Sequence, residues 1–216
     1  IAVSKHLKNK LIKSGINKDK ISVIYNGVAE LKIKDNKNSG EIIIGSIGRL
    51  HGVKGYENLI RSFAMINSTG LRLVIWGEGR ERVNLEKLIG DLGLKEKVEL
   101  AGYIDNIEEA LAKTDIYVQP SLSEGFGLTV VEAMLAGKPI IVTPVGSLEE
   151  IITNGKTGIV AEDISSKALA NALEIMLSDE ELITKLGEEA KKEAEERFDM
   201  DSWIRETEKV YLEISK

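Results

Sequence analysis

Short apolar runs alternate along the chain with longer segments in which apolar residues recur every three or four positions. The short runs are rich in Ile and Val and apolar at consecutive positions, as strands covered on both faces must be. They predict strands at Ile21–Tyr25, Ile42–Ile47, Leu71–Trp76, Val98–Leu100, Ile116–Gln119, Ile140–Thr143 and Gly158–Ala161. The longer segments predict helices at Tyr56–Ile66, Arg80–Leu92, Ile107–Lys113, Leu128–Ala136 and Leu148–Ile152. This alternation indicates an α/β fold with a doubly wound parallel sheet.

The C-terminal part has a helical pattern from Ser166 to the end of the chain. Its apolar residues have the spacing of helices that pack through one side; they are Leu169, Leu173, Leu177, Leu182, Leu186 and Ala190. We predict a last helix at Ser202–Ile214. Asp201 is its expected N-cap, because Asp is favoured at that position.

The N-terminal part predicts a short helix and an irregular connection. Ser4–Gly15 begins with a favoured N-cap residue and ends with a favoured stop residue. Glu30–Gly40 is polar and rich in lysine, so we expect a solvent-exposed loop there. No internal repeat or low-complexity stretch divides the sequence, and its 216 residues suit one domain.

Composition narrows the classes of protein and site that remain. The formal net charge of −6 argues against a nucleic-acid partner, because phosphates favour a basic surface. Cysteine is absent, which excludes disulfides and thiolate metal sites and suits a reducing, cytoplasmic setting. Two histidines, far apart in sequence, leave little for a histidine metal cluster. No apolar run approaches the ~20 residues that a membrane-spanning helix needs.

The loops after the predicted strands should lie along one edge of the sheet, where ligands bind in this architecture. They are glycine-rich, which lets backbone amides approach a ligand closely. The loop after Ile42–Ile47 also carries two cations, Arg49 and Lys54. The loop after Ile116–Gln119 leads into the helix Leu128–Ala136, whose N-terminal amides favour an anion. Together these features predict a diphosphate site and hence a nucleotide-containing ligand.

Two glutamates flank this predicted diphosphate site. Glu132 stands alone in the apolar Leu128–Ala136, so we expect it to be buried and to have a partner or a purpose. Glu124 lies in the loop just before that helix. At ~1.5 Å rise per residue Glu132 is roughly one turn beyond the helix start, and the two carboxylates would bracket a phosphate. Carboxylates accept hydrogen bonds from vicinal hydroxyls, so the pair predicts a sugar nucleotide.

These residues resemble the retaining glycosyltransferases of family 4, also called group 1, which have the GT-B fold of two Rossmann domains. The strongest similarity is Glu124-Gly-Phe-Gly-Leu-Thr-Val-Val-Glu132, which resembles the family's two glutamates separated by seven residues. Four further segments match in order and spacing, and the resemblance covers essentially the whole chain. They are Gly48-Arg49-Leu50…Lys54-Gly55, Gly77-Glu78-Gly79, Gly102-Tyr103 and Thr114-Asp115…Pro120-Ser121.

The resemblance implies a role for each matching residue. Arg49, Lys54 and Glu124 would be the catalytic residues. The two cations would neutralise the donor diphosphate and the charge of the leaving group, so no metal would be needed. Glu124 would contact hydroxyls of the transferred sugar, and Glu132 would hold the ribose. The other donor contacts would come from Gly48 in the phosphate loop, Tyr103 and Ile104 beside the nucleobase, and Gly125, Phe126, Gly127, Leu128 and Thr129 around sugar and phosphate.

The resemblance also implies what the whole protein would do. Family members transfer a glycosyl group from a UDP- or GDP-sugar to a glycan or lipid-linked acceptor, with no cofactor besides that co-substrate. Their acceptor-binding domain is N-terminal, and nothing in this chain corresponds to it. We expect residues 1–216 to be the Rossmann-like, donor-binding C-terminal half, with part of the inter-domain connection in 1–30 and a C-terminal helix in 200–216. Alone it would turn over little; the full-length enzyme would be cytoplasmic, with peripheral membrane association as one option.

Other interpretations stay open on the sequence alone. Arg49 and Lys54 could be ordinary surface cations. Glu124 could cap the following helix, and Glu132 could pair with a structural arginine. Asp199-Met200-Asp201 resembles a DxD metal motif, but it follows the sheet and precedes a helix, so we expect no metal there.

For the whole protein, the alternatives are a nucleotide-sugar 2-epimerase and a non-catalytic nucleotide-sugar-binding module. A dehydrogenase is disfavoured, because no Gly-x-Gly-x-x-Gly opens the first helix of the sheet.

Overall fold

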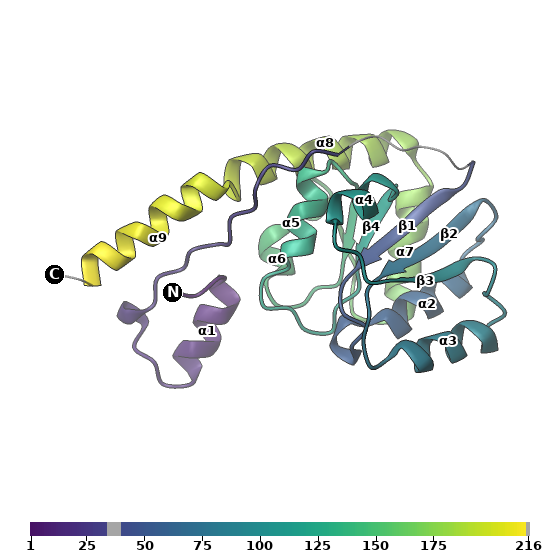
Figure 1. The fold of residues 1–216 in the computed structure, drawn as a ribbon, viewed down its shortest axis with the longest axis horizontal. Coiled ribbons are helices and arrows are strands. Elements are labelled where there is room, and N and C mark those ends of the chain that lie inside the picture. The colour runs from purple at the N-terminus through teal and green to yellow at the C-terminus, as the bar shows by residue number, and fades with distance from the viewer. Residues whose placement is uncertain (34–39, 215–216) are drawn as a thin grey trace.

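The computed structural model describes residues 1–33 and 40–214, in which six parallel strands form one sheet with helices on both faces (Figure 1). The strands are β1 (Ile42–Ile47), β2 (Leu71–Trp76), β3 (Val98–Gly102), β4 (Ile116–Gln119), β5 (Ile140–Val142) and β6 (Ile159–Val160). The helices are α1 (Lys5–Lys13), α2 (Tyr56–Met65), α3 (Arg82–Asp91), α4 (Ile107–Ala112), α5 (Leu128–Leu135), α6 (Leu148–Ile151), α7 (Ser166–Leu177), α8 (Glu180–Arg197) and α9 (Met200–Ile214). From β1 to β6, every predicted strand and helix is confirmed to within two residues at each end.

The strand order is β3-β2-β1-β4-β5-β6, which is doubly wound about the boundary between β1 and β4. β1 pairs in parallel with β2 on one side and with β4 on the other, where Ile44 lies opposite Ile116. Chain connections leave in opposite directions on the two sides of this boundary, and ligands of doubly wound sheets bind at the carboxyl ends of the strands at such a point. The topology therefore selects the loops after β1 and β4 as the place for a ligand.

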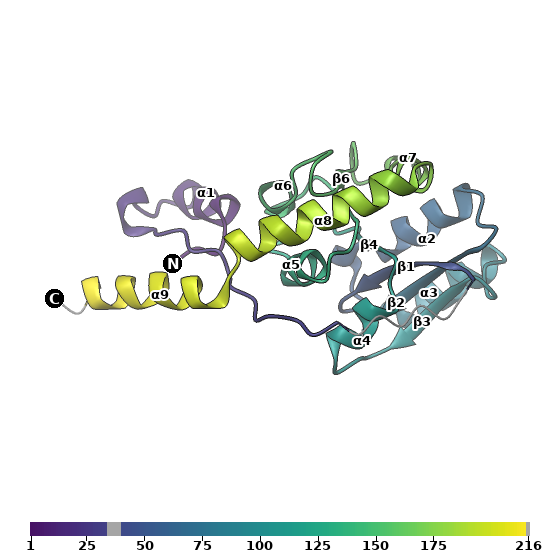
Figure 2. The ribbon, with the colours of Figure 1, turned by 90° about the horizontal axis from the view of Figure 1, so that it is seen from above.

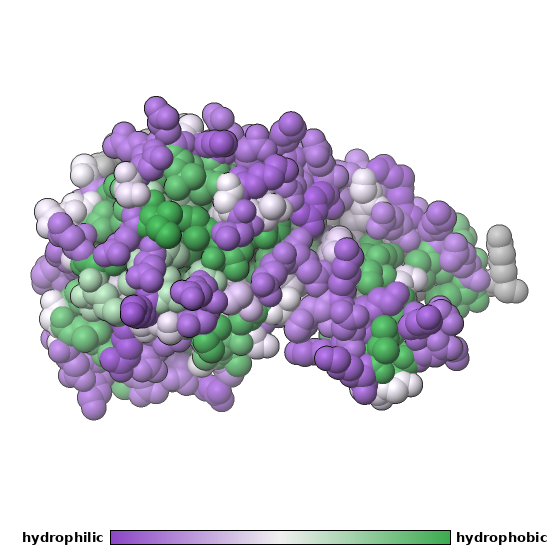
Figure 3. Space-filling model, turned by 180° about the vertical axis from the view of Figure 1, so that it is seen from behind, coloured by the Kyte–Doolittle hydropathy of each residue, from purple (hydrophilic) through white to green (hydrophobic). Residues whose placement is uncertain are grey.

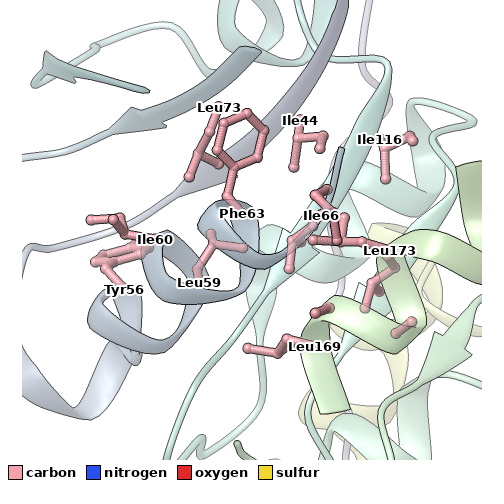
Figure 4. Packing of buried hydrophobic residues seen from close by; sticks show 14 of the residues in the cluster. Ile44, Tyr56, Leu59, Ile60, Phe63, Ile66, Leu73, Ile116, Leu169 and Leu173 are labelled. Atoms are coloured by element: carbon pink, nitrogen blue, oxygen red, sulfur yellow. The ribbon is translucent and has the colours of Figure 1, made fainter. Parts of the chain in front are cut away.

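Successive side chains along a strand point to opposite faces of the sheet, and one hydrophobic core forms on each face. In β4, Ile116 and Val118 belong to the core beneath α2, α3 and α7, whereas Tyr117 belongs to the core beneath α4, α5 and α8. Figure 4 shows the first of these cores, where Phe63 of α2 points toward Leu73 and Ile44 of the sheet. Because the sheet is covered on both faces, its strands read as continuous apolar runs.

The chain termini form a smaller part beside the sheet. In Figures 1 and 2, α1 and α9 lie next to each other and away from the strands. Seen from behind in Figure 3, apolar residues reach the surface in patches on both parts. Between Met200 and Ile214, α9 has no buried residue, and it exposes Ile204, Tyr211, Leu212 and Ile214.

Two predictions for the terminal part were wrong. Ile21–Tyr25 is not a strand: Val23 forms an isolated bridge with Ala2, because this segment lies away from the sheet and has no ladder to join. Ile21 and Ile24 are nevertheless buried, which explains the apolar run. Asp201 is not the N-cap of α9, because the helix starts at Met200 and the Ser202 amide donates to the Asp199 carboxylate at 2.8 Å.

Two expectations fall partly outside the described residues. Residues 30–33 have no helix or strand, as expected of a loop, whereas 34–39 lie outside what the structure describes. The same holds for residues 215–216 at the end of the expected C-terminal helix. None of the helices described is both long and apolar enough to cross a membrane.

Candidate functional site

The loops at the carboxyl ends of the strands pack directly on one another through glycines. An added Cβ atom would stand 1.9 Å from the Gly48 carbonyl oxygen at Gly77, 1.9 Å from the Glu124 carbonyl oxygen at Gly146, and 2.0 Å from the Pro120 carbonyl oxygen at Gly55. Such approaches are open to glycine alone, because every other residue has a Cβ. The loops after β1, β2, β4 and β5 therefore form one continuous edge, as the sequence predicted.

Lys54 and Glu124 meet at the centre of this edge. The Lys54 Nζ atom lies 2.7 Å from Glu124 Oε2, although the two residues come from the loops after β1 and β4. Their side chains are 19% and 14% exposed, so the pair is largely shielded from water. Ser121 Oγ donates to the same carboxylate oxygen at 3.2 Å. The switch point of the sheet thus brings together a cation and a carboxylate that the sequence had placed 70 residues apart.

Arg49 lies on the same loop as Lys54 but in a different environment. The residue is exposed, whereas its neighbour Leu50 is fully buried and anchors the loop. Within residues 1–33 and 40–214, no ion pair or side-chain hydrogen bond engages the Arg49 guanidinium. The exposed Arg49 guanidinium adds positive charge to the loop that also carries Lys54, and its donors remain available to an anion.

The N-terminus of α5 opens onto the same edge. Gly127 is its N-cap, in a left-handed conformation with φ 101°, and no side chain caps the helix. The alternative that Glu124 caps α5 is therefore wrong, since its carboxylate binds Lys54 and Ser121 instead. Uncapped amides at a helix start favour an anion.

The other residues expected around sugar and phosphate differ in exposure. Gly125 is exposed, and Leu128 is 47% exposed. Phe126 is buried and packs against Tyr25 and Phe198, so its ring is structural and its backbone alone faces the loop. The Thr129 hydroxyl donates inward to Gln119 Oε1 at 3.1 Å. Contacts from this stretch to a ligand would therefore come mainly from the backbone.

Glu132 lies on α5, about one turn beyond its start. It is half-buried rather than fully buried, which corrects the expectation from its apolar helix. No arginine pairs with it in the described part of the chain, so the structural ion pair considered above does not form. Burial raises the pKa of the Glu132 carboxyl above its ordinary value. A carboxylate held in this state without a partner is suited to accept hydrogen bonds from an incoming ligand.

Tyr103 and Ile104 follow the edge strand β3. The Tyr103 side chain is 73% exposed, whereas Ile104 is half-buried against the second core. The Gly77 amide donates to the Gly102 carbonyl at 2.7 Å, which joins this loop to the one after β2. Both residues therefore lie at the β3 end of the same edge, on the β2 side of the Lys54–Glu124 pair.

A buried set of polar side chains beneath Glu124 escaped the sequence analysis. Tyr117, Gln119 and Ser121 are fully buried and hydrogen-bonded to one another through Gln119. The sequence pattern identifies Gln119 only as the last residue of a predicted strand. The available signal was a neutral amide closing an apolar strand, because a buried amide must find partners for all its polar atoms.

Metal-binding groups are not gathered at this edge. Across residues 1–33 and 40–214, no three His, Asp or Glu side chains come together as a metal site would require. The positive groups of the edge are instead Lys54, Arg49 and the start of α5.

Known proteins share this fold and sequence pattern. An uncharacterized glycosyltransferase of Methanocaldococcus jannaschii is 34% identical over 98% of this chain and 59% of its own length. N-acetyl-alpha-D-glucosaminyl L-malate synthase of Bacillus anthracis is 31% identical over 92% of this chain and 55% of its own length. The crystal structure of HepE of Anabaena in complex with UDP and glucose superposes with a TM-score of 0.87 at 25% identity, over 97% of this chain and 61% of that chain. The chain thus spans little more than half of each relative.

A family match covers most of the chain. Residues 28–193 match the family described as glycosyl transferases group 1. That region contains all six strands of the sheet and every candidate residue from Gly48 to Glu132. The Rossmann-like fold and the resemblance inferred from the sequence motifs are both confirmed. This chain belongs to the glycosyl transferases group 1 family.

Proposed function

We propose that this chain is the donor-binding half of a retaining, nucleotide-sugar-dependent glycosyltransferase. The observation that carries the proposal is the Lys54–Glu124 pair at the switch point of the sheet, beside the uncapped start of α5. A sugar nucleotide offers a partner to each group, because its diphosphate attracts the ammonium and its sugar hydroxyls donate to the carboxylate. Membership of the group 1 family supports the same conclusion.

The proposed chemistry is transfer of the glycosyl group to an acceptor hydroxyl. The bond between the anomeric carbon and the β-phosphate oxygen breaks, and the acceptor oxygen bonds to that carbon. The proton of the acceptor hydroxyl passes to the departing diphosphate or to water. Negative charge develops on the departing diphosphate. Arg49, Lys54 and the α5 amides would stabilise that charge, as preorganised donors do in other transfer sites. We therefore propose a metal-independent reaction with no cofactor besides the sugar nucleotide.

The remaining contacts follow from the order of the loops. Glu132 would accept hydrogen bonds from the ribose, and Tyr103 and Ile104 would lie beside the base. We propose UDP as the nucleotide, with GDP as the competing candidate, because HepE was crystallised with UDP and glucose. The acceptor would be a glycan or a lipid-linked glycan. A cytoplasmic setting is supported by a sequence without cysteine, and peripheral membrane association remains part of the proposal.

The nucleotide site can be tested on the chain itself by titration calorimetry with UDP and GDP. We expect UDP to bind, and Arg49→Ala to weaken binding by roughly 1–3 kcal/mol, the range for a charged hydrogen bond. The matched control is Arg61→Ala, which removes an exposed guanidinium that pairs with Glu57 on α2. It should leave the affinity unchanged. A folded wild-type chain that binds neither nucleotide would defeat the proposal.

The reaction itself is tested with the full-length protein. We expect incubation with donor and acceptor to yield a new glycosidic bond that mass spectrometry detects. An epimerised nucleotide sugar in its place would favour the 2-epimerase alternative. Nucleotide binding without either product, over a broad panel of acceptors, would favour a non-catalytic binding module.

A further inference from the structure

A chain of buried hydrogen bonds runs from the sheet to the Glu124 carboxylate. Gln119 Oε1 accepts from the Tyr117 hydroxyl at 2.7 Å and from the Thr129 hydroxyl at 3.1 Å. Gln119 Nε2 donates to Ser121 Oγ at 2.8 Å, and Ser121 Oγ donates to Glu124 Oε2 at 3.2 Å. The chain therefore links strand β4 and helix α5 to the carboxylate that we propose to contact the donor sugar.

The orientation of Gln119 determines the direction of these hydrogen bonds. Its amide oxygen serves two hydroxyl donors, so its NH₂ group must face Ser121. Ser121 Oγ accepts that bond, which leaves its own proton to be donated to Glu124. With the amide flipped, Tyr117 and Thr129 would lose their acceptor and Ser121 would face a second oxygen. The orientation with the Gln119 NH₂ group toward Ser121 is thus the one in which these four side chains all find hydrogen-bond partners.

The network is well shielded and well anchored. Tyr117, Gln119 and Ser121 are all fully buried, so water does not compete for their hydrogen bonds. Thr143 Oγ1 also donates to the Ser121 carbonyl at 2.6 Å, which holds the backbone of the loop. By contrast, Glu124 lies in a loop whose next residue, Gly125, is exposed. The carboxylate therefore needs support from below to keep one orientation.

We propose that Gln119 is a positioning residue that orients Glu124, through Ser121, for contact with the donor sugar. This inference rests on the proposed function, and it assigns the network to binding of the sugar part of the donor. The nucleotide is held by other groups, so the network bears on the sugar rather than on UDP. Lys54 binds the same carboxylate oxygen from the opposite loop, which completes the support of Glu124 when no ligand is present.

Two variants separate positioning from folding. Ser121→Ala removes the hydroxyl that bonds Glu124 and leaves Gln119 in place. Gln119→Met removes the amide donor to Ser121 and fills similar space with an unbranched apolar side chain. The matched control is Ser62→Ala, because Ser62 is also a fully buried serine whose hydroxyl donates, at 2.7 Å, to Leu59 O in α2. Thermal unfolding of each variant establishes that it is folded.

The readout is the affinity for a sugar nucleotide relative to UDP, by calorimetry with UDP, UDP-glucose and UDP-N-acetylglucosamine. We expect one of the two sugar nucleotides to bind the wild-type chain more tightly than UDP. In both variants that advantage should fall about tenfold, the loss expected when a hydrogen bond to a charged group is disturbed. The affinity for UDP itself, and all affinities of the Ser62→Ala control, should stay within about twofold of wild type.

Each other outcome decides against the inference. Equal weakening of UDP and of the sugar nucleotide would indicate a structural role and overturn it. Unchanged affinities, or a wild-type chain for which neither sugar alters the affinity, would also overturn it while leaving UDP binding intact. Absence of UDP binding by the wild-type chain would instead defeat the proposed function, and the inference with it.

Discussion

The two glutamates of the family motif differ in how the structure holds them. Glu124 is neutralised by Lys54 and bonded by Ser121, whereas Glu132 has no partner among the described residues. A half-buried carboxylate without a partner lowers the stability of the fold, because the charged form loses hydration. A protein retains such a group when a ligand, rather than the fold, provides the compensation.

Replacing Glu132 with Gln should therefore stabilise the chain without ligand. Burial raises the pKa of Glu132 above its ordinary value of about 4.5, so between the two values the folded state binds more protons than the unfolded state. The stability of wild type thus falls as the pH rises through that window, and the loss is complete above the folded-state pKa. Because the group is partly exposed, we expect a gain of about 1 kcal/mol or less for Glu132→Gln at pH 7.

Urea unfolding of both proteins at a series of pH values tests this. The free energies of unfolding of the two proteins should be equal at low pH and should diverge as the pH rises, with Glu132→Gln the more stable. The control is Glu206→Gln, which removes an exposed carboxylate on α9. The explanation would be wrong if Glu132→Gln were less stable at neutral pH, or if the gain did not depend on pH. The same variant should bind UDP more weakly, because an amide offers the ribose hydroxyls one acceptor oxygen and no charge in place of the proposed carboxylate.

The Lys54–Glu124 pair should show strong coupling in stability. Lys54→Met leaves a carboxylate that is mostly shielded from water without its cation, so we expect a loss of roughly 1–3 kcal/mol. Glu124→Gln in the Lys54→Met background should restore part of that loss, because the unpaired charge disappears. A double-mutant cycle by urea unfolding measures the coupling between the two residues. Additive losses would show that the 2.7 Å contact contributes nothing to the fold.

At the scale of elements, the sequence pattern was most reliable where the sheet repeats. Each β-α unit has a short apolar run, a glycine-rich turn and an amphipathic segment, so neighbouring predictions supported one another. The errors arose where one local pattern has two explanations. Ile21–Tyr25 is apolar because two of its isoleucines are buried outside the sheet. Asp199 and Asp201 are both favoured N-cap residues and lie only two positions apart.

The candidate site could also be predicted as far as local sequence patterns show its residues. Charged residues in glycine loops indicated Lys54 and Glu124, and the topology alone then brought them together. The support beneath them was not predictable in this way. The role of Gln119 depends on which face of β4 it occupies and on Thr129 reaching it from α5, and both are consequences of the completed fold. Contacts between side chains of different elements are set by the three-dimensional fold and not by any local sequence pattern.

Close packing of the loops makes one glycine critical for the shape of the edge. Gly146 and Gly155 have similar left-handed backbones, with φ 64° and 75°. A Cβ at Gly146 would stand 1.9 Å from the Glu124 carbonyl oxygen, whereas at Gly155 nothing lies within 4 Å. Alanine at Gly155 should cost about 1–2 kcal/mol from backbone strain alone. Alanine at Gly146 should cost roughly 1–3 kcal/mol more, because two backbone segments must separate.

Urea unfolding of Gly146→Ala and Gly155→Ala compares a strained site that has a clash with one that has none. We also expect Gly146→Ala to weaken UDP binding, since it displaces the loop that carries Glu124, whereas Gly155→Ala should not. Equal losses of stability in the two variants would mean that the loops after β4 and β5 can move apart at little cost in free energy. The rigid edge on which the donor site depends would then be absent.

At the scale of the whole molecule, the terminal part is tied to the sheet close to the candidate site. The Ser4 hydroxyl donates to the Gly125 carbonyl at 3.0 Å, directly beside Glu124. The Val28 amide donates to the Phe198 carbonyl at 2.9 Å, where α8 ends. Tyr25 stacks on Phe126 and meets Phe198 edge-on. The loop that carries Glu124 is therefore in contact with the N-terminal segment, so a movement of one part would act on the other.

Besides the Ser4 contact, α1 is attached through the carboxylate of Glu150, which gives the last prediction. No residue of Lys5–Lys13 is buried, and a free helix of this length is marginal in water. Its position is set by Glu150, whose carboxylate accepts from the Lys5 amide at 2.9 Å, from the His6 amide at 2.6 Å and from the Tyr25 hydroxyl at 3.0 Å. A carboxylate at a helix N-terminus is favoured by both its hydrogen bonds and the helix dipole.

Glu150→Gln removes the charge and one acceptor, and we expect α1 to detach more often while the sheet stays folded. Trypsin should then cut after the lysines of α1 about tenfold faster, because proteolysis follows the population of the opened segment. Mass mapping of early fragments identifies those cuts, and the control is Glu149→Gln, an exposed carboxylate one residue earlier. Cleavage of α1 at the wild-type rate would show that the apolar contacts of Ala2 and Ile24 hold the segment without Glu150. Faster cleavage throughout the chain would instead show that Glu150 stabilises the whole fold.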